Sequence, residues 1–457
     1  MGFIRKYSFF LLATLFLFQP GSILTAQEYT LLRNSRIYTM GNKGLLQKGM
    51  ILIRGKKIEK IGESIDYPSG ARIIDLSGKT IIPGIVCASS SLFLERKDRT
   101  FSGEEKLDAD ILEGLNYFDM SIAEMLKHGV TTVYISPVSF QSIGGLGAVL
   151  KLKANKEGSL EILKARAGLK LRLERMENKK TSSVLRLTQY NRIRDLFKQA
   201  QEYRKEWDEY EKKLKEYEEA QKDKSKERDI SVDKKLKEPK KPRKNEPKEI
   251  LVHAMEKKIP VFFEVHRPDT ILNALRLAKE FGLKIILESC EEWNRVLPQL
   301  KDASVPILSN PLLNYKKFML PGGERGYAAG LLDVPKDSFF YSETASSLQN
   351  EKAEKNWAKL VSLKIPFALI PPDHFPLSTR YMRLFASLLV SRGISTLEAL
   401  KAITSMPAGI LGVSERIGSL ERGKDADLVV LDGEPLSSLS TVKMVFVDGL
   451  LAWEGKK

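Results

Sequence analysis

The sequence is poor in the residues that build disulfide frameworks and metal centres. Its 457 residues include only two cysteines, Cys87 and Cys290, and four histidines. Two cysteines exclude the dense disulfide framework that stabilises small secreted domains. Both end apolar, strand-like runs, so we expect two buried thiols, which is the usual environment of free cysteine.

The apolar run near the N-terminus is too short to span a membrane. Phe9 to Phe18, interrupted by Thr14, falls well below the roughly 20 residues of a transmembrane helix. It follows Arg5 and Lys6 and precedes a Pro-Gly break and a small-residue site that ends at Ala26. This pattern predicts a signal peptide over residues 1–26. We therefore expect an exported protein, periplasmic or extracellular, that is soluble after cleavage.

Acidic residues are scarce relative to basic ones, and the formal net charge is +16. Residues 151–197 alone hold thirteen Lys and Arg against five Asp and Glu. In an exported chain this excess favours solubility, or contact with an anionic envelope surface or an acidic partner, over binding of nucleic acid. We therefore expect no nucleic-acid partner.

Residues 155–249 differ from the rest in composition and predict an insertion. Apolar residues recur at steps of three and four over about 188–222, which predicts an amphipathic helix with a coiled-coil-like seam. Its members are Tyr190, Ile193, Phe197, Ala200, Tyr203, Trp207, Tyr210, Leu214 and Tyr217. Its partner is a second copy, the main domain or another protein. Over about 223–249 the seam gives way to Lys and Pro, which predicts a solvated loop.

The remaining middle of the chain alternates apolar strands with amphipathic helices, which is typical of parallel βαβ units. The units over 83–417 suffice for a TIM (β/α)₈ barrel, and a doubly wound open sheet is the alternative. Both ends of the chain, 27–82 and 418–457, contain short strands and tight turns. We expect them to combine into one small β-sandwich, with the barrel inserted between them.

Five motifs, in order along the chain, resemble landmarks of the amidohydrolase superfamily, especially its imidazolonepropionase-like and prolidase-like bacterial branch. They are GMILIRGKKIEKIGE, IIDLSGKTIIPGIV, ALKAITSMPAGILGV, IGSLERGKDADLVVLDGEPL and VFVDG. The resemblance implies a metal-dependent TIM-barrel hydrolase of C–N bonds in amides or cyclic amides. In that family a His-x-His on the first barrel strand, a Lys or Glu on the fourth, histidines on the fifth and sixth and an Asp on the eighth hold one or two divalent metals.

The resemblance places serine where the first metal ligands belong. In IIPGIVCASSSLFL the His-x-His pair aligns with Ser89 and Ser91, and the sixth-strand histidine falls near Ser289. A serine hydroxyl is neutral and shorter than an imidazole, and it is a poor ligand for zinc. We therefore expect little or no metal, with zinc as the ion if one weak site remains.

Three residues fit the other family positions. His266 matches the fifth-strand histidine, Asp373 matches the eighth-strand aspartate that acts as the catalytic base, and Lys151 is the candidate for a bridging lysine. One hypothesis is a catalytically impaired homologue that binds a small amide or peptide-like ligand, or docks on a related amidohydrolase or a second copy through the 188–222 helix. The alternative is an active amidohydrolase with an abbreviated metal site centred on His266 and Asp373.

Overall fold

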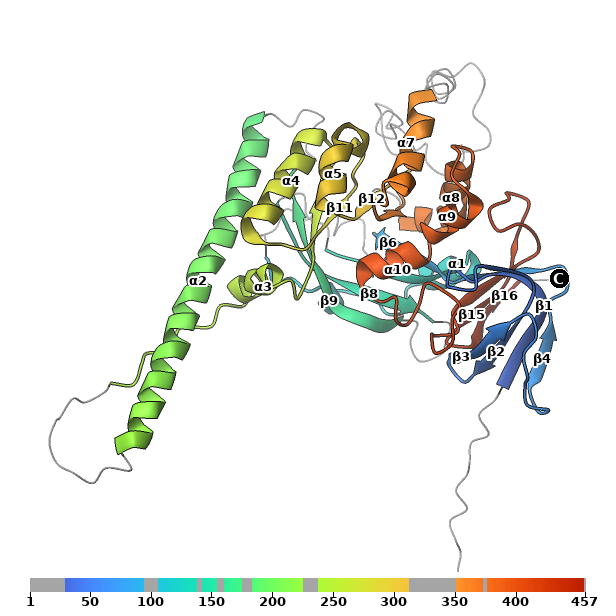
Figure 1. The fold of residues 1–457 in the computed structure, drawn as a ribbon, viewed down its shortest axis with the longest axis horizontal. Coiled ribbons are helices and arrows are strands. Elements are labelled where there is room, and N and C mark those ends of the chain that lie inside the picture. Colours follow the sequence, from blue (N-terminus) through green and yellow to red (C-terminus); the bar gives the residue numbers. More distant parts are fainter. Residues whose placement is uncertain are drawn as a thin grey trace, which may run out of the picture.

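The computed structural model describes residues 29–93, 106–137, 142–153, 160–174, 183–224, 237–311, 351–372 and 376–455, with the backbone alone for 223, 224, 351–356 and 376. Two bodies lie side by side, and one long helix stands at the edge of the larger one (Figure 1). The expected signal peptide, 1–26, lies outside these residues. Within them, no helix combines the length and the apolar character needed to cross a membrane.

The smaller body is an eight-stranded sheet that both ends of the chain build together. Its strand order is β16-β15-β14-β5-β1-β2-β3, and β4 pairs with β1. The pairings of β1 with β4 and β5 are parallel, and the others are antiparallel. The strands are β1 (Tyr29–Tyr38), β2 (Leu45–Arg54), β3 (Lys57–Gly62), β4 (Arg72–Asp75), β5 (Thr80–Pro83), β14 (Leu428–Leu431), β15 (Val442–Val447) and β16 (Leu450–Glu454).

The larger body contains a second eight-stranded sheet, in the order β13-β12-β11-β10-β9-β8-β7-β6. The strands follow one another in the sheet as they do in the sequence, which fits a barrel and rules out the doubly wound alternative. This sheet is a nearly closed barrel, so the predicted fold class is confirmed. Its strands are β6 (Ile85–Ser90), β7 (Val130–Ile135), β8 (Ile143–Leu152), β9 (Leu160–Arg172), β10 (Val261–Glu264), β11 (Ile285–Glu288), β12 (Ile307–Ser309) and β13 (Phe367–Leu369).

One barrel strand departs from the expected parallel arrangement. β8 runs antiparallel to both β7 and β9, whereas β6–β7 and β9 to β13 pair in parallel. The turn between β7 and β8 is short, and a short connection joins antiparallel strands, whereas a parallel neighbour needs a longer crossover. The barrel therefore contains seven parallel strands and one reversed strand among the described residues.

The position of β9 corrects the predicted insertion. We expected the insertion to begin at residue 155, but Leu160–Arg172 is the fourth strand of the barrel and pairs with β8 and β10. The expected loop over 223–249 also ends early, because helix α3 (Glu246–Met255) begins with Asn245 as its cap, whose side chain accepts a hydrogen bond from Lys248 N. What lies outside the barrel is therefore the segment between β9 and α3.

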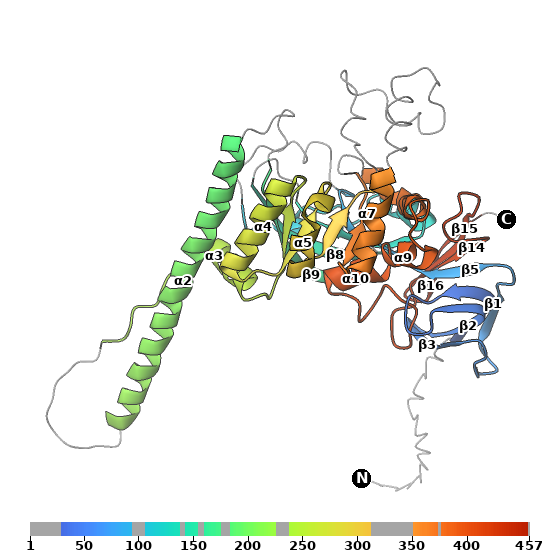
Figure 2. The same ribbon diagram turned by 45° about the horizontal axis from the view of Figure 1, so that its top comes forward.

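Helix α2 (Ser183–Lys224) fills most of that segment, and only part of it contacts the barrel. Over 42 residues an α-helix extends about 63 Å, at 1.5 Å per residue. Its first half packs on α3 and on α4 (Pro268–Phe281), where Phe197 stacks on Phe281 with 5.2 Å between ring centroids. Its second half projects away from the rest of the molecule in both views (Figures 1 and 2).

Most of the other helices cover the outside of the barrel, and the last one packs on the interior cluster that contains Phe262. α1 (Ser121–Lys127) precedes β7, α4 connects β10 to β11, and a 3₁₀ turn (Trp293–Val296) with α5 (Leu297–Ala303) connects β11 to β12. α7 (Glu351–Ser362) precedes β13, and the 3₁₀ helix Pro376–Tyr381, α8 (Met382–Val390), α9 (Thr396–Lys401) and α10 (Ser405–Leu411) follow it. Helix α4 shows why these segments are helical: Pro268 starts it, and Gly282, with φ 68°, ends it.

Aromatic and aliphatic side chains fill the inside of the barrel. Tyr134 of β7 stacks on Phe262 of β10 with 4.4 Å between ring centroids, and both side chains are fully buried. The sequence makes room for these rings with glycine, because a Cβ on Gly168 would lie 2.3 Å from the Phe262 ring. The barrel interior is thus a solid core, and chemistry is confined to its ends.

Candidate functional site

A layer of charged residues lies above the apolar core, where the parallel strands end; we call this end the barrel mouth. Side chains alternate between the two faces of a strand. On β9 the inward positions therefore run from Gly168 to Lys170 and Arg172. On β10 and β11 the inward residues Phe262 and Ile286 are followed two positions later by Glu264 and Glu288. The four charged residues of this layer form what we call the mouth network.

Ion pairs join the four members of the mouth network. Lys170 Nζ lies 2.5 Å from Glu288 Oε2 and 3.1 Å from Glu264 Oε2. Arg172 Nη2 donates to Glu264 Oε2 at 2.7 Å. Each of the four residues is less than one-tenth exposed. Two cations and two carboxylates therefore neutralise one another inside the barrel mouth.

The environment keeps the network ionised. Burial disfavours the charged form of Glu264, but Arg172 and Lys170 outweigh this effect and hold the pKa of its carboxyl well below the usual range. Burial also opposes the charge on Lys170, yet Glu288 and Glu264 raise the pKa of its ammonium. At neutral pH the Lys170 ammonium and the Glu264 carboxylate are therefore both charged.

A glycine on the neighbouring strand creates the space for Lys170. A Cβ added to Gly144 of β8 would lie 2.7 Å from Lys170 Cγ, well inside van der Waals contact. The reversed strand β8 therefore approaches β9 closely enough that only glycine leaves the lysine its path. The sequence Gly144-Gly145, which directly follows Ile143 at the start of β8, is the local signal for this close approach.

Two of the three serines at the end of β6, Ser89 and Ser90, take part in this arrangement or border it. Ser89 Oγ donates to Glu288 Oε1 at 2.5 Å, so its hydroxyl is a hydrogen-bond partner of the network. Ser90 is buried and shares a hydrogen bond with Thr379 at 2.9 Å. Ser91 is half-buried. At the aligned positions of the family's His-x-His, this chain thus presents hydroxyls, one of which is committed to a carboxylate.

His266 lies beside the network, two residues after the end of β10. Its side chain is buried, and its ring nitrogens are 3.8 Å from Glu264 Oε1 and 3.6 Å from Glu291 Oε1. Its backbone N–H donates to Glu174 Oε1, which also accepts from the N–H of Arg267. His266 therefore combines a structural role at the start of α4 with a position at the barrel mouth.

The remaining predicted site residues lie at or near the same end, or outside the described structure. Ser289 follows β11 with φ 54° and is buried, so the residue at the sixth-strand position is close to the mouth but carries no imidazole. Asp373 and its neighbour His374 lie outside the described residues. Cys290 and Cys87 are both buried free thiols, as expected.

Lys151 lies at the opposite end of the barrel from His266. Because β8 is reversed, its C-terminal Lys151 pairs with Thr132, near the start of β7. Its fully buried ammonium lies 2.6 Å from Asp425, 2.9 Å from Asp427 and 2.5 Å from Asp448. A lysine in this position has no access to the barrel mouth, so the structure does not support Lys151 as a bridging metal ligand.

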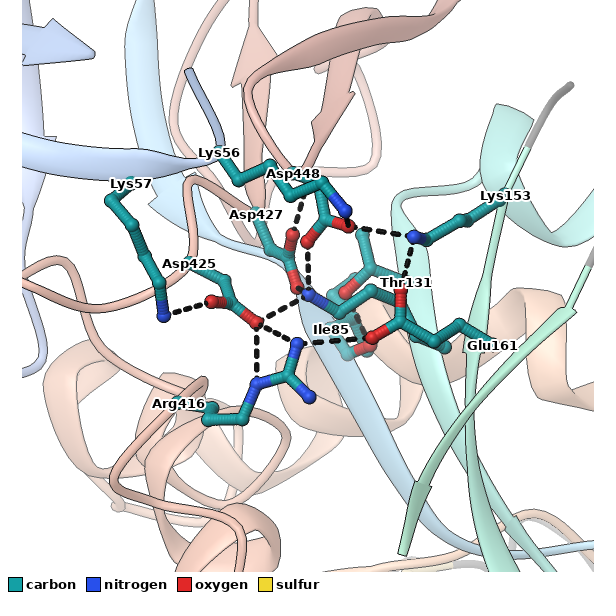
Figure 3. A network of polar contacts seen from close by, with 11 residues as sticks. Lys56, Lys57, Ile85, Thr131, Lys153, Glu161, Arg416, Asp425, Asp427 and Asp448 are labelled. Atoms are coloured by element: carbon teal, nitrogen blue, oxygen red, sulfur yellow. Dashed lines mark hydrogen bonds and ion pairs between the residues drawn. The ribbon is translucent and has the colours of Figure 1, made fainter. Parts of the chain in front are cut away.

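The three aspartates around Lys151 belong to the smaller body and join it to the barrel; with Lys151 they form what we call the interface network (Figure 3). Oxygen atoms of the three carboxylates lie within 4.8 Å of one another, a spacing that a divalent cation accepts. The Lys151 ammonium already neutralises this position. In the chain as it stands, the cluster therefore joins two bodies and leaves no room for an ion.

Further cations surround the interface network. Lys57 and Arg416 contact Asp425 at 2.5 and 2.8 Å, and Lys153 contacts Asp448 at 2.7 Å. Burial nevertheless raises the pKa of Asp427 to about 6, because it outweighs the opposite effects of the Lys151 ammonium and of the hydrogen bond from Asp448 N. The sequence signal for this network is the segment GKDADLVVLDG at 423–433, in which Asp425 and Asp427 flank Ala426 just before β14.

The comparisons with known proteins agree with this architecture. A sequence profile described as "Amidohydrolase family" matches residues 373–451. The solved structure of an amidohydrolase from Thermotoga maritima MSB8 has a TM-score of 0.68 with this chain, at 28% sequence identity, over 93% of this chain and 100% of that one. The chain belongs to the amidohydrolase superfamily.

Curated relatives match over shorter stretches. Imidazolonepropionase from Thermoplasma volcanium is 34% identical over 97 residues, which are 20% of this chain and 24% of that protein. Amidohydrolase tasK from Hapsidospora irregularis is 34% identical over 77 residues, or 17% of this chain and 8% of that protein. A prolidase solved with N-methylphosphonate-L-proline shares the fold, with a TM-score of 0.52 at 16% identity.

Members of the amidohydrolase superfamily usually bind a divalent metal, and the described part of this mouth does not fit one. A zinc site normally needs three protein ligands in fixed geometry. Here His266 is the one imidazole among the described mouth residues, and the carboxylates of Glu264 and Glu288 are engaged by Lys170. An ammonium and a divalent cation cannot share that position. The residues present thus provide their own cation.

Sequence reasoning missed the mouth network. The charge excess of residues 151–197 predicts solvent-exposed lysines and arginines, but Lys170 and Arg172 within it are 8% and 7% exposed. The signal was present in LKARAGLKLRLE (163–174), where charged and apolar residues alternate over most of the segment. Such alternation is typical of a half-buried strand and would have placed Lys170 and Arg172 on one face.

Proposed function

We propose that this chain is an exported amidohydrolase-superfamily protein that binds a small amide or peptide-like compound at the barrel mouth without metal-dependent hydrolysis. The observation that carries the proposal is the Lys170 ammonium between Glu264 and Glu288. In the superfamily, a metal at this end of the barrel lowers the pKa of a water and polarises the scissile carbonyl. An ammonium carries one charge, has no open coordination position and supplies neither effect.

The mouth nevertheless offers hydrogen-bond donors to a ligand. Arg172 uses Nη2 on Glu264, and among the described residues its buried Nε and Nη1 have no hydrogen-bond partner. An unmet buried donor costs about 1–3 kcal/mol. A ligand carbonyl or carboxylate oxygen that accepts from Arg172 would recover this cost. A peptide-like compound supplies such oxygens, which is why we favour it as the ligand class.

Metal content tests the first part of the proposal. We expect the purified full-length protein, incubated with zinc and then desalted, to hold far less than one zinc per chain by elemental mass spectrometry. A Lys170→Gln variant removes the internal cation and should hold more, whereas Lys164→Gln, on the same strand but outside the mouth network, should match the wild type. Stoichiometric zinc in the wild type would contradict the proposal.

The alternative is an active amidohydrolase with an abbreviated metal site centred on His266 and Asp373. The burial of His266 at the mouth is the observation that favours it. It predicts that the wild type binds zinc tightly, that a panel of dipeptides and cyclic amides is hydrolysed, and that His266→Ala or Asp373→Ala removes both. Turnover without this dependence on the two residues would count against the alternative.

Ligand binding tests the second part. We expect at least one compound from the same panel to raise the melting temperature of the wild type and of Arg267→Gln. Arg267 is an exposed arginine next to His266 whose side chain contacts Asp269. Arg172→Lys keeps the charge but loses the planar donor set, and should lose the shift. An equal shift in all three proteins would show that Arg172 does not contact the ligand.

Two finer parts of the proposal concern location and partners. Export follows from the predicted signal peptide, and intact mass of protein recovered from the producing cell's envelope fraction should correspond to a chain that starts near Gln27.

For α2 we propose docking on a second copy or a related amidohydrolase through its projecting half. Deletion of residues 208–236 should then reduce the mass measured by light scattering, and an unchanged mass would discard self-association.

A further inference from the structure

A cavity of about 210 Å³ lies between the barrel and the smaller body, and none of the four residues of the mouth network lines it. Three segments line it: the end of α1 at His128, the start of α8 with Arg380, Arg383 and their neighbours, and the loop between β14 and β15 with Ser437 and Ser440. This volume holds several water molecules or one small polar ligand, since a water takes about 30 Å³ in the liquid. The lining is rich in groups that donate hydrogen bonds.

Arg383 brings a cation to this cavity without an ion-pair partner. Its guanidinium donates to the backbone carbonyls of Pro435 at 2.8 Å and Ser440 at 3.0 Å. None of the described carboxylates forms a salt bridge with it, and burial lowers the pKa of the guanidinium, against a weaker opposite effect of Asp432. Carbonyl groups satisfy its hydrogen bonds but leave its charge unbalanced.

Two further donors at the cavity have no hydrogen-bond partner among the described residues. They are the buried Nε of Arg380 and the hydroxyl of Ser440, a residue that is 7% exposed. The other two guanidinium nitrogens of Arg380 donate hydrogen bonds to Glu124 at 3.4 Å and to the Tyr381 hydroxyl at 2.6 Å. Buried polar groups are almost always hydrogen-bonded. Two donors without a partner at one cavity therefore indicate an acceptor that the described residues do not supply.

The acidic groups around the cavity are engaged elsewhere. Glu124 contacts the His128 ring at 3.1 Å as well as Arg380. Asp432 accepts from the backbone and hydroxyl of Thr441 and pairs with Lys443. Two guanidinium groups thus face the cavity and one partly shared carboxylate, Glu124, borders it. Arg380 is thus paired with Glu124, whereas the charge of Arg383 has no ion-pair partner among the described residues.

We propose that this cavity binds a small tetrahedral oxyanion, of which inorganic phosphate is the simplest, held by Arg380, Arg383 and the hydroxyl of Ser440. A tetrahedral oxyanion presents several acceptor oxygens at once, as three donors from different directions require. The site is independent of the barrel mouth and of the function proposed for it. Because its donors come from the barrel and from the β14–β15 loop, the bound anion also links the two bodies.

Phosphate titration of the full-length protein tests the site. Isothermal calorimetry is carried out with sodium phosphate at constant ionic strength maintained by chloride, and we expect saturable binding of one phosphate per chain. Ser440→Ala should weaken the affinity about tenfold or more, since a hydrogen bond to a charged group contributes about 1.5–3 kcal/mol. The same variant should fold normally, because the hydroxyl it removes has no hydrogen-bond partner among the described residues.

Two variants move the affinity in opposite directions. Arg380→Gln should weaken phosphate binding by about tenfold or more, whereas Glu124→Gln should strengthen it, because the bordering negative charge is removed. Ser391→Ala, an exposed serine on a helix end that donates to Leu388 O, serves as the control and should bind as the wild type does. Equal affinity in the wild type, Ser440→Ala and Arg380→Gln would refute the proposal.

Two parallel titrations identify the source of the oxyanion. Sulfate should compete with phosphate if geometry and charge decide, and phosphoserine should compete only if the cavity accepts a phosphate ester. Competition by phosphoserine would extend the proposal to phosphorylated small molecules, and its failure would restrict the site to free anions. If the heat of phosphate binding disappears when chloride holds the ionic strength constant, the signal comes from charge screening alone and the proposal is overturned.

Discussion

Removal of Lys151 should destabilise this protein more than removal of any of the exposed lysines around it. Lys151→Met keeps the length and the apolar stem of the side chain but deletes the ammonium that Asp425, Asp427 and Asp448 share at 2.5–2.9 Å. The three aspartates are 2%, 4% and 3% exposed, so water cannot replace the lost cation. Removing one partner of a buried ion pair costs about 3–5 kcal/mol, and here three carboxylates lose it together.

The loss should depend on pH in a defined direction. In the wild type, burial already raises the pKa of Asp427 to about 6, so this carboxyl favours the folded state when protonated and its contribution to stability declines as the pH rises through about 4 to 6. Deleting the ammonium raises the pKa of its neighbours as well. The stability difference between wild type and Lys151→Met should therefore be largest at pH 7 to 8 and smaller at pH 5.

Urea unfolding at pH 7.5 and pH 5 measures this difference, with Lys153→Met as the control. Lys153 contacts Asp448 but is partly exposed, so its loss should cost much less. A second measurement is sharper: in Lys151→Met the three carboxylates, within 4.8 Å of one another, become a site for an oxygen-preferring divalent ion. Millimolar Ca²⁺ or Mn²⁺ should stabilise the variant and leave the wild type unchanged. Equal stability of variant and wild type in urea would refute the reasoning.

Two further variants test the mouth network and the packing of α2. Ser89→Ala leaves Glu288 without a hydrogen-bond donor and should lower the free energy of unfolding by about 1.5–3 kcal/mol, the range for a hydrogen bond to a charged group. Ser91→Ala should change the free energy of unfolding by less than about 0.5 kcal/mol. Chemical denaturation distinguishes the two variants. Phe197→Ala should cost about 3–5 kcal/mol through lost packing of α2, whereas Leu214→Ala on the projecting half should be nearly neutral, and thermal unfolding checks the pair.

The sequence predicted the large-scale architecture well because that architecture depends on local patterns. Turn residues and short apolar runs at both ends, such as Leu428–Leu431, identified the strands of the smaller body. Alternating strands and helices identified the barrel, and the ordered motifs identified the superfamily. The seam from Ile193 to Tyr203 correctly marked the face of α2 that is buried in the structure, because helical periodicity reports burial whatever the partner is.

The candidate site was harder to predict because it depends on which charges meet in three dimensions. Lys151 lies on a strand of the barrel, yet the reversal of β8 places it at the end opposite the barrel mouth. Lys170 and Arg172 lie in a segment whose high charge suggested a solvated patch. No local pattern says that their partners are Glu264 and Glu288, which come about ninety residues or more later in the chain.

The same physical device occurs at both ends of the barrel. At the mouth, Lys170 lies between Glu264 and Glu288, and at the base Lys151 lies among three aspartates. In each case a buried lysine supplies the positive charge that clustered carboxylates need. This arrangement stabilises a fixed geometry, but an ammonium on a side chain cannot activate a water as an exchangeable metal does. The serines at 89–91 are consistent with this substitution, because a mouth that is already neutral needs no imidazole ligands. Zinc binding by Lys170→Gln but not by the wild type would connect the two observations directly.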